Sequence, residues 1–180
     1  MSSNQDATVK NINMSSRTKL IGTWECLYFR AVNINDSNDI TYPFSEDVKG
    51  NLVYSADGYM ASFMQHPNAA EKEETNEAAS ENLKQQQGGH SIPSTSGYHG
   101  IWELEEIESG KMKLVHTMLI SLPAAWNGQS QVRMGTMWED GGTQYMKLEP
   151  ELDVSLSDGK VERRMEVGWR KRKPSKGAAL

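Results

Sequence analysis

Apolar and polar residues are distributed unevenly along the chain, and the pattern predicts a β-sheet domain between polar flanks. Large apolar side chains concentrate in the middle of the sequence and are scarce in residues 1–18, 66–97 and 171–180. Most apolar runs are short, rich in aromatic and β-branched residues, and separated by Gly, Asp, Asn or Ser, which is typical of strands and turns. The predicted strands are residues 20–32, 51–54, 59–65, 98–106, 111–122, 129–138, 143–148 and 161–170.

Eight strands joined mostly by short turns predict an up-and-down meander of antiparallel strands. Closing the meander into a barrel removes both exposed sheet edges, and an eight-stranded barrel has room inside for one small ligand. A length of 180 residues suits a single domain. The fold class is therefore all-β, a single eight-stranded antiparallel barrel over residues 19–171, with a flexible arm over 1–18 and a flexible tail over 172–180.

Two polar stretches interrupt the series of predicted strands. Residues 33–50 are dense in Asn, Asp, Ser and Pro and are predicted to be turns. Residues 69–97 begin with strong helix formers but have almost no apolar face, so they cannot pack as a core helix. We expect a helical or loop excursion at 69–97, weakly packed because few apolar groups offset its chain entropy.

Strand alternation predicts which side chains point into the barrel. Trp102 is expected on the inner face of its strand. In residues 129–138, Gln131 and Arg133 share one face; if that face points inward, the cavity holds a cation, and otherwise Arg133 is a surface charge. In residues 111–122 the mainly apolar face carries Met112, Leu114, His116, Met118, Ile120 and Leu122.

Four short motifs follow one another along the chain. They are Gly22-Thr23-Trp24, Tyr42-Pro43-Phe44, Asp57-Gly58-Tyr59-Met60 and Gly168-Trp169-Arg170. Their order resembles the lipocalin-like domain family of small intracellular bacterial and fungal proteins, and the resemblance covers about residues 20–171. It implies a calycin-type barrel closed at its floor by a cation–π contact between Arg170 and Trp24.

Charge and cysteine content argue against several classes of function. The net charge of −5 argues against nucleic acid as a partner, because phosphate binding needs a concentrated positive field. Cys26 is the only cysteine, so no internal disulfide can form, and we expect it to be a small core residue. Neither a signal-peptide run nor a membrane span is found in the sequence. We expect a cytoplasmic protein without a membrane span, with a homodimer left open.

Candidate chemistry is limited to isolated polar residues on otherwise apolar faces. The four histidines are scattered without metal-ligand spacing, and no phosphate-binding glycine loop is present, so we expect no cofactor and no metal. His116 and Arg133 are the candidate catalytic residues, as general acid or base and as oxyanion partner. A hydrogen-bonded core histidine is the alternative for His116. The candidate substrate-binding residues are Tyr54, Tyr59, Met64, Trp102, Met118 and Trp126.

Two functions fit these residues. The resemblance implies a place in natural-product (secondary metabolite) biosynthesis, as a cofactor-free isomerase, cyclase or related lyase acting on a hydrophobic intermediate. The alternative is a non-catalytic carrier for an apolar small molecule. A histidine on an apolar inner face favours the enzyme, because a carrier needs few buried polar groups.

Overall fold

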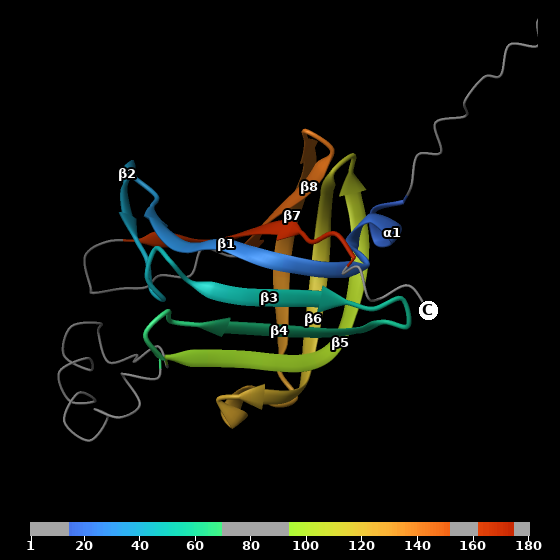
Figure 1. The fold of residues 1–180 in the computed structure, drawn as a ribbon, viewed down its shortest axis with the longest axis horizontal. Coiled ribbons are helices and arrows are strands. Elements are labelled where there is room, and N and C mark those ends of the chain that lie inside the picture. Colours follow the sequence, from blue (N-terminus) through green and yellow to red (C-terminus); the bar gives the residue numbers. More distant parts are fainter. Residues whose placement is uncertain (1–14, 70–93, 152–161, 175–180) are drawn as a thin grey trace, which may run out of the picture.

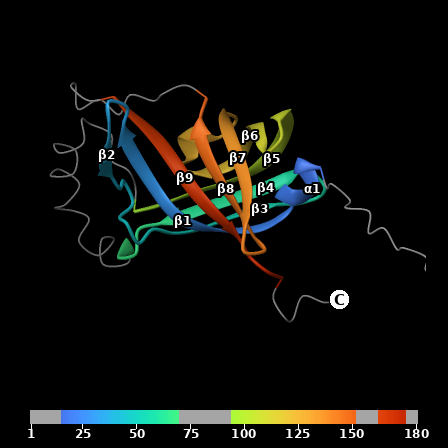
Figure 2. The same ribbon diagram turned by 90° about the horizontal axis from the view of Figure 1, so that it is seen from above.

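The computed structural model of the chain describes residues 15–69, 94–151 and 162–174. Its strands form one antiparallel sheet, and the pairing of β1 with β9 closes the sheet into a barrel, as Figures 1 and 2 show. The predicted eight-stranded antiparallel barrel is therefore confirmed. The eight strands of the ring are β1 (Gly22–Asn33), β3 (Lys49–Tyr54), β4 (Tyr59–Gln65), β5 (Thr95–Glu108), β6 (Lys111–Leu122), β7 (Ser130–Asp140), β8 (Thr143–Pro150) and β9 (Arg163–Lys171).

A further strand, β2 (Asp36–Thr41), is not one of the eight strands of the ring and pairs with the last residues of β1, Ala31 to Asn33 (Figure 1). The prediction of turns throughout residues 33–50 is wrong here. Polar contacts hold β2: Arg163 donates two hydrogen bonds to the Asp39 carboxylate at 2.9 and 2.8 Å, and Asn33 Nδ2 donates to Asp39 Oδ2 at 3.0 Å. A strand held by polar side chains has no apolar alternation by which the sequence could predict it.

One end of the barrel is covered by a short helix, α1 (Ser16–Leu20). Leu20 is fully buried, and its carbonyl accepts a hydrogen bond from Trp24 Nε1 at 2.8 Å. The Arg17 guanidinium lies over the ring of Trp102, 4.3 Å from its centroid. Residues 16–18, which were predicted to belong to the N-terminal arm, are therefore part of this helix, which is too short to show an apolar periodicity.

The cation beside Trp24 is not the one that the resemblance implied. In the β1–β9 register, Trp24 pairs with Lys171 and Glu25 pairs with Arg170. Lys171 Nζ lies 5.4 Å from the centroid of the fully buried Trp24 ring. Arg170 instead donates to Glu25 Oε2 at 2.7 Å. The prediction of a cation–π contact between Arg170 and Trp24 is therefore wrong, and Lys171 is the cation that lies beside the Trp24 ring.

A β-bulge in β6 changes which side chains face inward. The pairing of β6 with β5 skips Leu119, so the alternation is inverted beyond it. Met118 is fully buried, whereas Ile120 and Leu122 are 68% and 55% exposed. The predicted inward orientation of Ile120 and Leu122 is wrong, because an extra residue moves every following side chain to the other face.

Parts of three predictions lie outside the described residues. These parts are residues 1–14 of the arm, 70–93 of the excursion and 175–180 of the tail. β5 begins at Thr95, so the last residues of the predicted excursion belong to the barrel wall. Within the part of the chain that the structure describes, no helix is long and apolar enough to cross a membrane.

Candidate functional site

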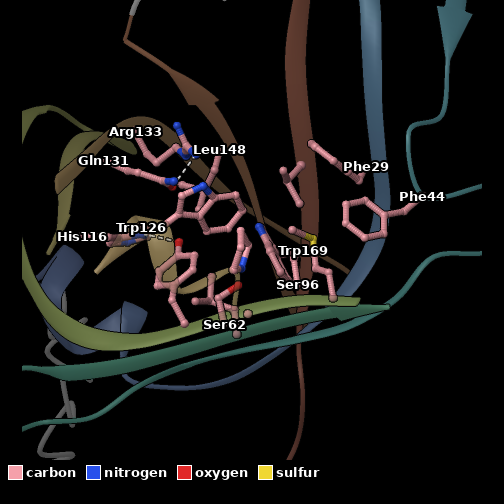
Figure 3. A pocket seen from close by; sticks show the side chains of 16 residues that line it. Phe29, Phe44, Ser62, Ser96, His116, Trp126, Gln131, Arg133, Leu148 and Trp169 are labelled. Atoms are coloured by element: carbon pink, nitrogen blue, oxygen red, sulfur yellow. Dashed lines mark hydrogen bonds between the residues drawn. The ribbon is translucent and has the colours of Figure 1, made fainter. Parts of the chain in front are cut away.

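A cavity of about 550 Å³ occupies the part of the barrel interior away from α1. Trp24 and Trp102, which contact α1, do not line it. The volume suits one small molecule, since ligand pockets have about 300–1,000 Å³. The lining residues, shown in Figure 3, are Phe29, Phe44, Leu52, Ser62, Met64, Ser96, Gly97, Tyr98, His116, Pro123, Trp126, Gln131, Arg133, Leu148, Val167 and Trp169.

Most of the cavity wall is apolar. Phe29 and Phe44 pack against each other with their ring centroids 5.5 Å apart and lie on the side away from His116 in Figure 3. Leu148 and Trp169, from β8 and β9, add further apolar surface. Burial of apolar surface contributes about 25 cal/mol per Å², so this wall favours a ligand whose bulk is apolar.

The polar residues of the cavity include a histidine held between two tyrosines. His116 is only 1% exposed. Its Nε2 lies 2.8 Å from the Tyr54 hydroxyl, and its Nδ1 lies 3.1 Å from the Tyr98 hydroxyl. Tyr54 is buried behind the cavity wall, whereas Tyr98 lines the cavity. Both ring nitrogens of His116 are therefore engaged, and Tyr98 presents this cluster to a ligand.

Burial keeps all three groups of this cluster uncharged near neutral pH. Burial, together with the positive charge of Arg133, lowers the pKa of His116 to about 3. Burial raises the pKa of Tyr54 well above its usual value, and burial also raises the pKa of Tyr98, against the smaller opposite effect of Arg133. The imidazole therefore carries a single N–H, and both tyrosines keep their hydroxyl protons.

Arg133 supplies a cation to the same side of the cavity. It lines the cavity with Gln131, as Figure 3 shows, and its Nη2 donates to Gln131 Oε1 at 2.6 Å. This placement decides between the two alternatives that the sequence left open for Arg133. No carboxylate among the described residues pairs with it. A guanidinium in this setting can bind a carbonyl oxygen or a carboxylate.

Met64 and Trp126, two of the predicted binding residues, also line the cavity. Trp126 is half-buried at the end of the short 3₁₀ helix η1 (Ala124–Trp126) between β6 and β7, and its indole forms part of the wall. Tyr54 and Trp102 lie behind the wall, with their ring centroids 5.0 Å apart. They therefore support the site and do not line it.

Tyr59 and Met118 are the two candidates that the structure places elsewhere. Tyr54 pairs with Met60 in the β3–β4 register, so Met60 points inward and Tyr59 points outward. Tyr59 is 46% exposed and stacks on His99 at 5.7 Å. Met118 is fully buried beside the bulge of β6 and is not a lining residue.

Twelve of the sixteen lining residues were not among the predicted site residues, and Tyr98, Phe44 and Phe29 are three of them. Tyr98 is the most important, and its position on the same strand face as Trp102 was the signal that could have identified it. Phe44 lies in a run dense in Asn, Asp and Ser that was predicted to be turns, so no strand alternation could orient it. Phe29 lies in a strand with apolar residues on both faces, so alternation alone could not orient it.

The arrangement can bind an apolar molecule that carries an acceptor oxygen. Among residues 15–69, 94–151 and 162–174, no three His, Cys, Asp or Glu side chains come together as metal ligands would.

No curated protein matches the chain. The family model described as a lipocalin-like domain matches residues 21–172, which include every strand of the barrel. The chain therefore belongs to the lipocalin-like domain family, whose fold indicates a role in binding a small molecule.

Proposed function

We propose that the protein is an isomerase or cyclase that binds a mostly apolar molecule in the barrel and polarises one of its carbonyl oxygens. The observation that carries this proposal is that Arg133 and Tyr98 both line the same largely apolar cavity. Both groups can donate hydrogen bonds to an oxygen on which negative charge develops. Natural-product intermediates with a carbonyl group and a large apolar skeleton have this chemistry.

The state of His116 narrows its role in this reaction. Both of its nitrogens are hydrogen-bonded, and its pKa of about 3 leaves it a poor acceptor for a substrate proton. We therefore assign His116 to holding Tyr98, in place of the direct acid–base role expected from the sequence. No lining residue that the structure describes carries a carboxylate, so the proposal includes no proton abstraction by a side chain.

A ring closure or rearrangement within one molecule fits these groups. Electrons move within the substrate toward the polarised carbonyl, new bonds form and break in the same molecule, and the product has the same atoms as the substrate. The apolar wall contributes by holding a flexible chain in a reactive shape, which removes part of the entropic barrier. Arg133 and Tyr98 then stabilise the charge on the oxygen.

The alternative function is a carrier, and one observation favours it. The Tyr54 hydroxyl and both imidazole nitrogens are already hydrogen-bonded within the cluster, so the cavity can store a ligand without reacting with it. Enzyme and carrier share every binding feature and differ only in turnover.

Native mass spectrometry of the protein purified from the cells that make it naturally tests the proposal. We expect the spectrum to show a bound molecule, whose mass identifies it. This molecule and its biosynthetic precursors are then added to fresh protein, and the products are analysed. An isomer of unchanged mass should form, and Arg133→Met should slow its formation about 100-fold. Lys113→Met removes a half-buried cation that is paired with Glu151 and does not line the cavity, and it should leave the rate unchanged. If every added molecule were recovered unchanged, the isomerase or cyclase proposal would fail and the carrier function would remain.

A further inference from the structure

The hydrogen bonds around His116 limit where its single proton can lie. The Tyr54 hydroxyl is fully buried, and His116 Nε2, at 2.8 Å, is its hydrogen-bond partner among the described residues. If Nε2 carried the proton, it would donate to Tyr54, and the hydroxyl proton of Tyr54 would have no acceptor among those residues. If Nε2 is the acceptor, the Tyr54 hydroxyl donates to it, and the hydroxyl proton that still needs an acceptor is that of Tyr98, which faces the cavity.

The free-energy difference between the two tautomers is large enough for one of them to predominate. A buried donor without an acceptor is costly, and its typical cost corresponds to a preference of about tenfold or more. The imidazole then carries its proton on Nδ1 and donates it to the Tyr98 oxygen, 3.1 Å away. Tyr98 accepts this bond through a lone pair, so its own hydroxyl proton is free to point elsewhere. Ser62, which pairs with Tyr98 in the β4–β5 register, is one neighbour of this hydroxyl, and the cavity is the other.

We propose that Tyr54 fixes His116 as the Nδ1–H tautomer, so that Tyr98 offers a proton to the cavity and selects ligands with an acceptor oxygen there. The ligand class is a carbonyl, carboxylate or phenolate on an apolar skeleton, and ligands whose polar end can only donate are disfavoured. Arg133, which can only donate hydrogen bonds, selects the same class. The ligand class rests on the proposed function, whereas the tautomer does not.

Tyr54 is a positioning residue in this proposal, because it lies behind the wall and acts through His116. In the opposite tautomer, Tyr98 would donate to Nδ1 and present only lone pairs to the cavity. The wall would then combine an acceptor at Tyr98 with a donor at Arg133. The orientation of one proton therefore decides which ligand end the cluster accepts.

Nitrogen-15 NMR of histidine-labelled protein at pH 7 tests the tautomer directly. The His116 signals are assigned by their loss in His116→Gln. We expect a protonated Nδ1 and an unprotonated Nε2; a protonated Nε2, or two averaged nitrogens, would overturn the proposal. Tyr54→Phe should shift both nitrogens toward averaged values. Tyr59→Phe, on the outer face, should leave them unchanged. An unchanged pattern in Tyr54→Phe would also overturn the role of Tyr54.

The infrared carbonyl stretch of bound 2-acetylnaphthalene tests the ligand class. We expect a lower frequency in the wild type than in Tyr98→Phe, because the hydrogen bond from Tyr98 weakens the C=O bond. Equal frequencies with the probe bound in both proteins would overturn the ligand class. If the probe does not bind at all, the proposed function fails while the NMR result still decides the tautomer, so the two failures are distinguishable.

Discussion

The barrel interior has a packed half next to α1 and a hollow half around the cavity, although the same strands build both. On the packed side, Trp24 and Leu114 are fully buried and Met146 fills the space beside them. On the hollow side, Leu148 and Val167 face a space of about 550 Å³. His116 lies at the boundary: it pairs in register with the buried Trp102 and also lines the cavity.

The difference shows how one barrel provides both stability and binding. The packed half gains dispersion and burial energy from interdigitated large side chains. The hollow half gives up part of that energy and leaves apolar surface for a ligand to cover. The Tyr54–His116–Tyr98 cluster spans the boundary, so the packed half orients the polar group that the hollow half presents.

The largest expected effect is a difference in stability between two matched truncations. Leu114→Ala should lower the free energy of unfolding by about 3–5 kcal/mol, because it opens a void in a close-packed region. Leu148→Ala should cost about 2 kcal/mol, since one side of that leucine already faces the cavity and fewer contacts are lost. Urea denaturation measures both values. Equal losses would show that the two halves are packed alike.

Acidification should reveal the buried histidine at the boundary. Its pKa is about 3 in the folded protein against 6.5 in the unfolded chain, so the unfolded state takes up the proton first as the pH falls. The contribution of neutral His116 to the free energy of unfolding is fully present above about pH 6.5 and is lost progressively as the pH falls toward 3. Each pH unit costs about 1.4 kcal/mol in that window.

His116→Gln keeps hydrogen-bonding groups at this position but does not titrate. Between pH 6 and pH 4 the wild type should therefore lose about 2 kcal/mol more unfolding free energy than the variant. Denaturant titrations at both pH values give this double difference, in which the other histidines cancel. A wild type and a variant with parallel pH profiles would mean that His116 is not buried as the structure places it.

Filling the hollow half should weaken binding without unfolding the protein. Ser62 lines the cavity, whereas its neighbour Ala61 is exposed on the outer face. Ser62→Leu should lower the affinity for 2-ethylnaphthalene about tenfold or more by occupying its space, and Ala61→Leu should leave the affinity unchanged. Fluorescence titration measures both. Similar affinities in the two variants would place the probe outside the cavity.

The smallest expected effect concerns the closed end of the barrel. Lys171→Met removes the ammonium beside Trp24 and should cost less than about 1 kcal/mol, because the remaining side chain still covers the indole. Arg170→Met should cost less still, since its guanidinium pairs with Glu25 at the surface and exposed ion pairs contribute little to stability. Thermal denaturation ranks the two. A larger loss of stability in Arg170→Met than in Lys171→Met would indicate that Arg170, as the family resemblance implied, is the cation that contacts Trp24.

The sequence predicted the barrel because strand alternation and short turns are local signals. His116 could be placed inside because five apolar residues share its predicted face. The extra residue at Leu119 left His116 in place but moved Ile120 and Leu122 outward. No local pattern indicates a bulge within Met118-Leu119-Ile120, because these consecutive residues are all apolar.

The polar cluster itself could not be predicted from the sequence. Tyr54, Tyr98 and His116 come from β3, β5 and β6, and their contacts depend on two strand registers and on the barrel curvature. Alternation placed Gln131 and Arg133 on one face but could not say which face was inside. Closure of the ring decides that question, and closure is a property of the whole chain.

The central claim is that the hollow half binds an apolar molecule by an acceptor oxygen at Arg133 and Tyr98. The most direct test is the ratio of affinities for 2-acetylnaphthalene and 2-ethylnaphthalene, which share a skeleton size and differ in the carbonyl. We predict that this ratio falls about tenfold or more in Arg133→Met and in Tyr98→Phe, while Lys113→Met leaves it unchanged. A ratio that is the same in all four proteins would contradict the claim.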